Sequence, residues 1–225
     1  MSRDAGALAR LLQLASPALP VGAYSYSQGL EAAAEAGLVK DAASAQRWIG
    51  DVRDLALAGL EAPIVWRLLR AWSEGSGEAV RRWNDEFLAS RETAELRAET
   101  VQMGYSLRKL ARELGVEGAE ALAAPDEISF PAAFAFVANA WKIDPEDALA
   151  AYLWSWLENQ VLAAVKVVPL GQTDGQRLLL ALGDGIAATV HHATRVADDE
   201  LAGFAPGLAI VSARHETQYS RLFRS

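Results

Sequence analysis

The chain contains no cysteine and only three histidines among its 225 residues. Disulfides, thiolate catalysis and cysteine-based metal sites are therefore excluded. A protein that needs no disulfides fits the cytoplasm. The first ten residues carry Asp4 and lack the basic start, the apolar run and the small-residue cleavage site of a signal peptide. We therefore expect a cytoplasmic protein.

Basic residues are also in the minority. Lys and Arg number 21 against 29 Asp and Glu, which gives a net charge of −8. Such a surface repels phosphate backbones and anionic lipid headgroups, so we expect neither nucleic acid nor a membrane as a partner. The most apolar stretch, 148–168, has Glu158, Asn159 and Gln160 at its middle. A bilayer centre disfavours a carboxylate by about 3 kcal/mol, so this stretch predicts a buried helix of a soluble protein with one polar site.

Motifs for nucleotide binding and nucleophilic catalysis are missing. No GxxxxGK[ST] loop and no GxSxG elbow occurs, and the glycine-rich pieces at 171–175 and 183–185 are interpreted as loops and helix ends. Glu95 and Glu99 lie one helical turn apart among arginines, which is typical of a solvated, salt-bridged face. We predict no catalytic residue in this chain.

The histidines do not form a metal-binding pattern. His191 and His192 point about 100° apart if they are helical, so they do not readily share one metal. The run His215-Glu216 begins like a zinc-protease motif, but Tyr219 stands where the second histidine is required. We predict no metal site. The alternative from another class is a metal-dependent hydrolase that uses His215, Glu216 and Asp174. A direct nickel store is disfavoured by the few histidines and the absence of cysteine.

Helical spacing dominates the sequence. Asp144-Pro145 is a strong helix start, and Pro169 predicts the end of that helix near Val168. A second helix is predicted over 92–114, where an apolar stripe repeats in steps of four and three and Gly115 follows. Further helices are predicted at 7–15, 25–36, 41–60, 63–72, 78–90, 131–141 and 175–197, the last with a break near 183–185. Only Leu208–Val211 is a candidate strand. No internal repeat appears. The prediction is an all-α, irregular bundle of roughly eight to ten helices in a single domain, 1–225.

Two stretches need more explanation than packing alone. In 12–31, two prolines and a glycine form a stiff turn that leads to Tyr24 and Tyr26, which is either an interhelical corner or a presented aromatic patch. In 159–177, Lys166 stands alone in an apolar run and is followed by a polar, glycine-rich turn that contains Gln172. Lys166 either lies at a helix end, where its charge suits the helix dipole, or has a role in binding.

The C-terminus is the third such stretch. Residues 212–225 combine arginines at 214, 221 and 224 with Tyr219, Leu222 and Phe223 on an acidic protein. Arginine and aromatic side chains anchor many protein interfaces. Such a segment is either folded onto its own domain or ordered on a partner.

Four motifs in these regions resemble the UreF family of urease accessory proteins. They are SPALPVGAYSYSQGLE at 16–31, RETAELRAETVQMGYSL at 91–107, NQVLAAVKVVPLGQTDGQRLL at 159–179 and HETQYSRLFRS at 215–225. They occur in colinear order and extend to the end of the sequence. The departure at Tyr24, where phenylalanine is common in relatives, keeps the aromatic ring.

The resemblance implies a non-enzymatic, all-helical and commonly dimeric protein. Proteins of this kind bridge the scaffold UreD, called UreH in some organisms, and the nickel-carrying GTPase UreG. The complex then delivers nickel to apo-urease in a GTP-dependent way. Nickel and GTP would act through the partners, and this chain by itself would bind no cofactor.

The resemblance also implies roles for particular residues. Tyr24 and Arg221 match positions tied to scaffold-dependent ordering of the C-terminus and to GTPase recruitment, and Lys166 matches a position suggested for fidelity control. A phenol and a guanidinium can hydrogen-bond or stack, so a pair of Tyr24 with Arg221 is chemically reasonable. Residues 208–225 are expected to form a partner-dependent tail. The expected partner-binding residues are Tyr24, Tyr26, Lys166, Gln172, His215, Tyr219, Arg221, Phe223 and Arg224.

Overall fold

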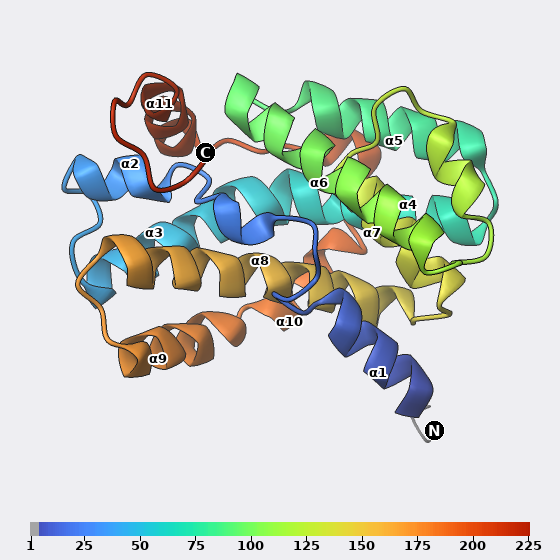
Figure 1. Cartoon of the computed structure of the whole chain (residues 1–225), viewed down its shortest axis with the longest axis horizontal. Helices are drawn as coiled ribbons and strands as arrows, with labels where there is room; N and C mark the ends of the chain where they lie inside the picture. The colour runs from blue at the N-terminus through green and yellow to red at the C-terminus, as the bar shows by residue number, and fades with distance from the viewer. Residues whose placement is uncertain (1–4) are drawn as a thin grey trace.

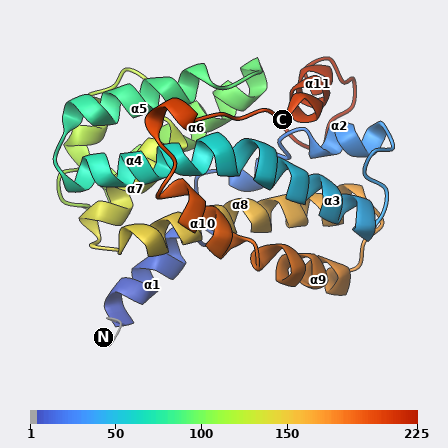
Figure 2. The same ribbon diagram turned by 180° about the vertical axis from the view of Figure 1, so that it is seen from behind.

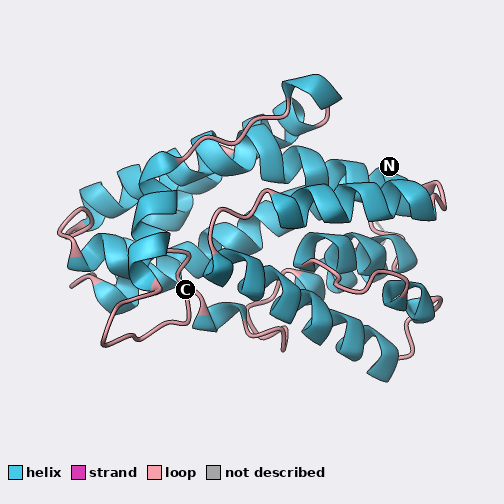
Figure 3. Cartoon of the chain, turned by 90° about the horizontal axis from the view of Figure 1, so that it is seen from above, coloured by secondary structure: helices cyan, strands magenta, loops and turns pink. Residues whose placement is uncertain are grey.

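Helices form the whole regular structure of the part of the chain that the computed structural model describes, residues 5–225, and no strand occurs there (Figure 3). The α-helices are α1 (Ala5–Leu14), α2 (Leu30–Glu35), α3 (Ala42–Val52), α4 (Ala62–Ser73), α5 (Gly77–Ala89), α6 (Ala94–Glu113), α7 (Phe130–Ala140), α8 (Pro145–Val167), α9 (Gln172–Gly183), α10 (Ile186–Ala193) and α11 (Pro206–His215). Short 3₁₀ turns are η1 (Ala23–Ser25), η3 (Ala119–Ala123) and η4 (Asp198–Glu200). A π-helical segment, η2 (Arg53–Glu61), joins α3 and α4 into one rod. The prediction of an all-α bundle is confirmed.

Most predicted helices appear within a few residues of their expected bounds, with two exceptions. The predicted helix 25–36 is divided, because Gln28 and Gly29 adopt positive φ values of 52° and 79° and α2 begins only at Leu30. The apolar run Leu208–Val211 lies inside α11 and forms no strand. Pro206 starts that helix from its first position, which a short strand pattern does not reveal.

The centre of the bundle is α7. Every residue from Pro131 to Ala138 is buried, and a helix that is apolar on all sides belongs inside a protein. It packs between α4 and α6 and also contacts α5 and α8. Phe134 meets Tyr152 of α8 edge to face, with ring centroids 5.2 Å apart. This contact fixes α8 against the core.

The longest helix, α8, crosses the face of the bundle that is nearest the viewer in Figure 1. The side chain of Asp144 caps it by accepting hydrogen bonds from the amides of Glu146 and Asp147 at 2.9 and 3.2 Å. Figure 1 shows α9 on one side of α8, with α2 and α11 on the other. In the part of the chain described, no helix combines the length and apolar character that a membrane span requires.

Two carbonyl groups of the π-helical segment η2 accept hydrogen bonds from a distant part of the chain. Leu55 and Gly59 accept hydrogen bonds at 3.0 Å from the amides of Phe204 and Ala202. Gly59 permits this approach, because a Cβ there would lie 2.1 Å from the oxygen of Ala202. Figure 2 shows the connection from α10 to α11 crossing α4 on the back of the molecule. At its end, η2 turns Glu61 into the core, where 7% of that residue is exposed.

A tight contact between α6 and the start of α7 gives a test of this packing. A Cβ on Gly104 would lie 2.1 Å from the carbonyl oxygen of Ile128, which belongs to the backbone and cannot rotate away. We expect Gly104→Ala to lower the free energy of unfolding by about 1–3 kcal/mol. In α11, Gly207 has no neighbour within 4 Å of the same position, so Gly207→Ala should leave it unchanged or slightly higher. Urea denaturation compares the two variants, and equal effects would contradict the packing.

Candidate partner-binding site

The C-terminal segment, residues 216–225, folds back over the helix α2 and the loop before it (Figure 1). It follows α11, which packs on α2. Gly29 lies directly against α11 at this contact, where a Cβ would lie 3.1 Å from the side chain of Val211. Residues 219–222 of the segment are all exposed, and burial alternates only at its end, where Phe223 and Ser225 are buried and Arg224 between them is exposed.

The last residue is held by the loop 25–28. The main-chain oxygen of Ser225 accepts hydrogen bonds from the backbone amide and the hydroxyl of Ser27, at 2.8 and 2.5 Å. The amide of Arg224 donates to the carbonyl of Ser25 at 2.8 Å. These bonds join positions almost 200 residues apart, so the two motifs at the ends of the sequence form one structural unit.

A buried carboxylate lies beneath this contact. Glu99 of α6 accepts hydrogen bonds from the hydroxyl of Ser225 at 2.8 Å and from the side-chain amide of Gln28 at 2.7 Å. The oxygen of Gln28 in turn accepts from the indole of Trp156 at 2.8 Å. Burial raises the pKa of Glu99 to about 7, and the charge of Glu61 adds to the rise. The hydrogen bonds from Gln28 and Ser225 oppose it.

The polar residues at the middle of α8 support the same loop. Asn159 and Gln160 donate to the carbonyls of Tyr26 and Ser27, at 2.9 and 3.3 Å. Burial raises the pKa of the neighbouring Glu158. The polar site expected within this apolar helix is therefore a support for the loop that holds the C-terminus.

A second carboxylate, Glu31 of α2, binds the C-terminal segment from the side. Its two oxygens accept from the amides of Leu222 and Phe223 at 2.7 and 2.8 Å. The fully buried ring of His215 lies between Glu31 and Glu95, with its nitrogens 3.3 and 2.7 Å from their oxygens. The guanidinium of Arg221 also donates to Glu95, at 2.6 Å.

Lys166 contacts the buried face of the segment. Its ammonium group lies 5.2 Å from the ring centroid of Phe223, within the range of a cation–π interaction. Lys166 occupies the last turn of α8, where its charge also suits the helix dipole. The structure therefore shows the helix-end position, and a role of Lys166 in binding a partner stays a prediction.

The structure separates the two tyrosines of the first motif. Tyr24 is 63% exposed in η1, whereas Tyr26 is only 5% exposed. Burial raises the pKa of Tyr26, and a hydrogen bond from the guanidinium of Arg224 acts in the opposite direction. The phenol–guanidinium pair thus forms between Tyr26 and Arg224, while Arg221 pairs with Glu95. A pair of Tyr24 with Arg221 is not what the structure shows.

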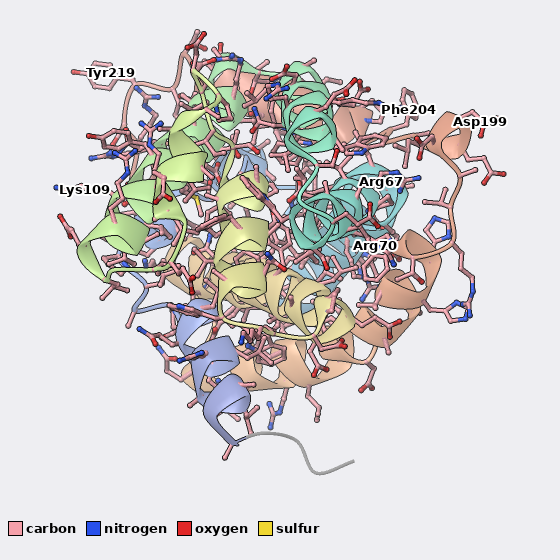
Figure 4. The ribbon with its side chains drawn as sticks, turned by 90° about the vertical axis from the view of Figure 1, so that its right-hand side faces the viewer. Arg67, Arg70, Lys109, Asp199, Phe204 and Tyr219 are labelled. Atoms are coloured by element: carbon pink, nitrogen blue, oxygen red, sulfur yellow. The ribbon has the colours of Figure 1, made fainter. Side chains whose placement is uncertain are left out.

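Among the other predicted residues, Tyr219 is fully exposed and points away from the protein in Figure 4, on the same side as Lys109. Gln172 is exposed at the first residue of α9, on the opposite side of α8 from α11 (Figure 1). Gln172 is therefore distant from the C-terminal segment, although it shares a motif with Lys166.

The residues required by the hydrolase alternative do not come together. His215 is enclosed by Glu31 and Glu95, whereas Asp174 lies on α9 and pairs with Arg177 at 2.9 Å. Within residues 5–225, no three acidic or histidine side chains are grouped in a way that could hold a metal ion. The geometry therefore gives this alternative no support.

The carboxylates that hold the C-terminal segment are not among the site residues predicted from the sequence. Glu95 and Glu99 were expected on a solvated face, but Glu99 is only 5% exposed and Glu95 faces His215 and Arg221. The spacing contains the signal for Glu99, since it lies three residues after Leu96 and four before Met103, both buried. The opposite holds for Leu114, which continues the apolar stripe in the sequence and was expected to be buried. It lies just beyond the end of α6 and is 51% exposed.

A cavity of about 110 Å³ lies between this network and the core. Its wall includes apolar residues together with Gln28, Glu61, Arg91, Glu99 and Tyr152. Glu61 accepts from the Tyr152 hydroxyl at 2.7 Å and from Arg91 at 2.9 Å. Burial, with the charge of Glu61, raises the pKa of Tyr152 well above its usual value. Each of these polar residues has a hydrogen-bond partner within the chain, although the buried Nε of Arg91 has none in residues 5–225. Gln28 and Glu99 are the members that join the loop 25–28 to the C-terminal segment.

The fold and this site define an all-helical protein whose C-terminal segment is anchored by buried acids and exposes aromatic, aliphatic and arginine side chains. Comparison with known proteins agrees with the resemblance found in the motifs. The sequence model of the UreF family matches residues 39–183. The urease accessory protein UreF of Azoarcus sp. (strain BH72) is 60% identical over 97% of this chain and 95% of its own. The proteins of the same name from Dechloromonas aromatica and Janthinobacterium sp. (strain Marseille) are 55% and 53% identical, over 97% and 99% of this chain and 97% and 100% of their own. The chain belongs to the UreF family.

The raised pKa of Glu99 predicts how stability depends on pH. Between its ordinary value of 4.5 and about 7, the folded state binds more protons at Glu99 than the unfolded state. The contribution of Glu99 to stability is therefore fully present below pH 4.5 and is lost as the pH rises through 7. A glutamine side chain at this position mimics the neutral acid and does not titrate. From pH 5 to pH 8, the free energy of unfolding of the wild type should fall relative to Glu99→Gln by about 2 kcal/mol.

Urea denaturation of both proteins at the two pH values measures this difference. Glu113→Gln is the control, because Glu113 lies on the same helix and its side chain is 62% exposed. The free energy of unfolding of Glu113→Gln should differ from that of the wild type by nearly the same amount at both pH values. Parallel pH profiles for the wild type and Glu99→Gln would contradict a raised pKa for Glu99.

Proposed function

We propose that this chain is the subunit of a nickel-insertion complex that bridges the scaffold UreD, or UreH, and the GTPase UreG during maturation of urease. In this proposal it works in the cytoplasm as a homodimer and carries out no catalysis. Nickel and GTP are handled by its partners and delivered to apo-urease. What supports the proposal is its family, whose members are named urease accessory proteins, together with the anchored C-terminal segment.

The C-terminal segment has the chemistry of a protein-binding surface. Tyr219 is fully exposed and Leu222 is 65% exposed, although both are large and apolar. Arg221 lies beside them with 39% of its side chain exposed. Tyrosine and arginine are enriched among residues that dominate binding energy. Because the segment is anchored at Glu31 and Glu99, less conformational entropy is lost when a partner binds it.

Removal of the segment tests its role in binding the scaffold. We expect a chain that ends at His215 to lose capture of a UreD-type scaffold in co-purification, whereas the full chain retains it. Circular dichroism should show that the truncated chain remains helical, because residues 216–225 contain no helix. Equal capture by a folded, truncated chain would contradict the assignment.

A pair of arginine substitutions tests the surface more finely. We expect Arg221→Ala to weaken scaffold binding by at least about tenfold, as removal of a central arginine anchor does. Arg214→Ala is the matched control, because it removes the same charge from an exposed position in the last turn of α11. Its affinity should stay within about twofold of the wild type. Equal losses in both variants would indicate a general charge effect.

Lys166 offers a test of the outcome in cells. We expect Lys166→Met to reduce the nickel content of urease purified from cells that carry it, because the contact between Lys166 and Phe223 is lost. Lys109→Met, on the exposed face of α6, should leave the nickel content unchanged. Elemental analysis of the purified urease gives the ratio of nickel to enzyme, and a wild-type ratio with Lys166→Met would rule out a role for this lysine.

A further inference from the structure

Glu31 has an unusual number of partners for a buried carboxylate. It is 9% exposed, and its two oxygens receive the amides of Leu222 and Phe223 and one ring nitrogen of His215. All three donors lie more than 180 positions away in the sequence. α2 contains no basic residue that could pair with this carboxylate, so α11, through His215, and the C-terminal segment supply its partners.

The two amide bonds determine which way the neighbouring side chains point. A hydrogen bond from the amide of Leu222 orients the peptide plane between Arg221 and Leu222, and the bond from Phe223 orients the next plane. With both planes held, Phe223 turns inward, where it is 5% exposed and meets Lys166. Leu222 turns outward at 65% exposure. Arg221 extends toward Glu95.

The charges around Glu31 reinforce this position. His215 lies between Glu31 and Glu95, and Arg221 pairs with the other oxygen of Glu95. A carboxylate that accepts two consecutive backbone amides forms charge-assisted hydrogen bonds, which are stronger than neutral ones. No other side chain in residues 5–225 accepts a hydrogen bond from the backbone amides of residues 221–225.

We propose that Glu31 is the positioning residue of the partner-binding surface: it holds the backbone at Leu222 and Phe223 so that Arg221 and Leu222 face the partner. This inference rests on the proposed function for its consequence in binding. The positioning itself is a property of the chain alone and is measured without any partner.

Hydrogen–deuterium exchange of the full chain tests the positioning. The amides of Leu222 and Phe223 should be protected in the wild type, where each donates to a different oxygen of Glu31. Their exchange should be at least about tenfold faster in Glu31→Gln, because glutamine places an NH2 group, which only donates, where one of the two accepting oxygens lay. Glu35→Gln is the control, one turn later on α2 and exposed. It should leave both amides protected. Unchanged protection in Glu31→Gln would overturn the proposal.

A pH profile separates positioning from a general structural role. Protection factors at Leu222 and Phe223, corrected for intrinsic exchange, should decrease in the wild type as carboxylates are protonated on acidification. In Glu31→Gln they should already be low and vary little with pH. His215, Glu95 and Arg221 face this site in both proteins. The two proteins differ only in the side chain at position 31, so the difference between their profiles depends on Glu31. Profiles of the same shape in both proteins would overturn the proposal.

A second pair of variants serves if Glu31→Gln fails to fold. Leu222→Pro removes the amide donor from the segment itself, whereas Leu222→Ala removes the exposed side chain and keeps the donor. We expect faster exchange at Phe223 in Leu222→Pro only. Equal exchange in the two variants would overturn the proposal.

Scaffold binding distinguishes this inference from the proposed function. If Glu31→Gln loosens the segment and weakens capture of the scaffold at least about tenfold, both stand. If the segment loosens and capture is unchanged, Glu31 still positions the segment, but the segment is not the binding surface. If the segment stays protected while Arg221→Ala abolishes capture, the binding surface stands and the role of Glu31 is wrong.

Discussion

Burial of a carboxylate requires hydrogen-bond donors around it, and this requirement joins distant parts of the chain. Glu31, Glu61 and Glu99 are each less than 10% exposed, and each is satisfied largely by donors from other elements. Glu61 accepts hydrogen bonds from Tyr152 and Arg91, and Glu99 accepts them from Gln28 and Ser225. Glu31 accepts them from the backbone of the C-terminal segment. The three acids therefore have all their hydrogen-bond partners only when η2, α2, α6, α8 and the C-terminal segment have come together.

This constraint explains how a short, irregular segment can present a defined surface. Residues 216–225 form no helix or strand, so the segment has little intrinsic order. The segment is ordered by buried hydrogen bonds to Glu31 of α2 and Glu99 of α6, and by the cation–π contact of Phe223 with Lys166 at the end of α8. The acidic groups and Phe223 lie inside, whereas Tyr219, Arg221 and Leu222 lie outside, a distribution suited to recognition by another protein.

Much of the fold was predictable because its signals are local. The capping residue Asp144 and Pro145 predicted the start of α8, and the apolar stripe predicted the buried side of α6. The break at Gln28 and Gly29 was missed, because their positive φ values serve a loop that binds Ser225 from the far end of the chain. The π-helical form of η2 was also missed, since its free carbonyls are satisfied by residues 202 and 204.

The sequence by itself determined the helical class, most helix positions and, through four motifs, the family. The caps, prolines and apolar spacing that predict a helix lie within a few turns of one another in the sequence, and a family is identified by motifs that follow one another along the chain. Only the tertiary structure decided which side chains form the site. Glu95 and Glu99 resembled a solvated pair until His215, Arg221 and Ser225 were found against them. The physical reason is that burial and hydrogen bonding of a polar side chain depend on neighbours in space, and here those neighbours are more than 100 residues away.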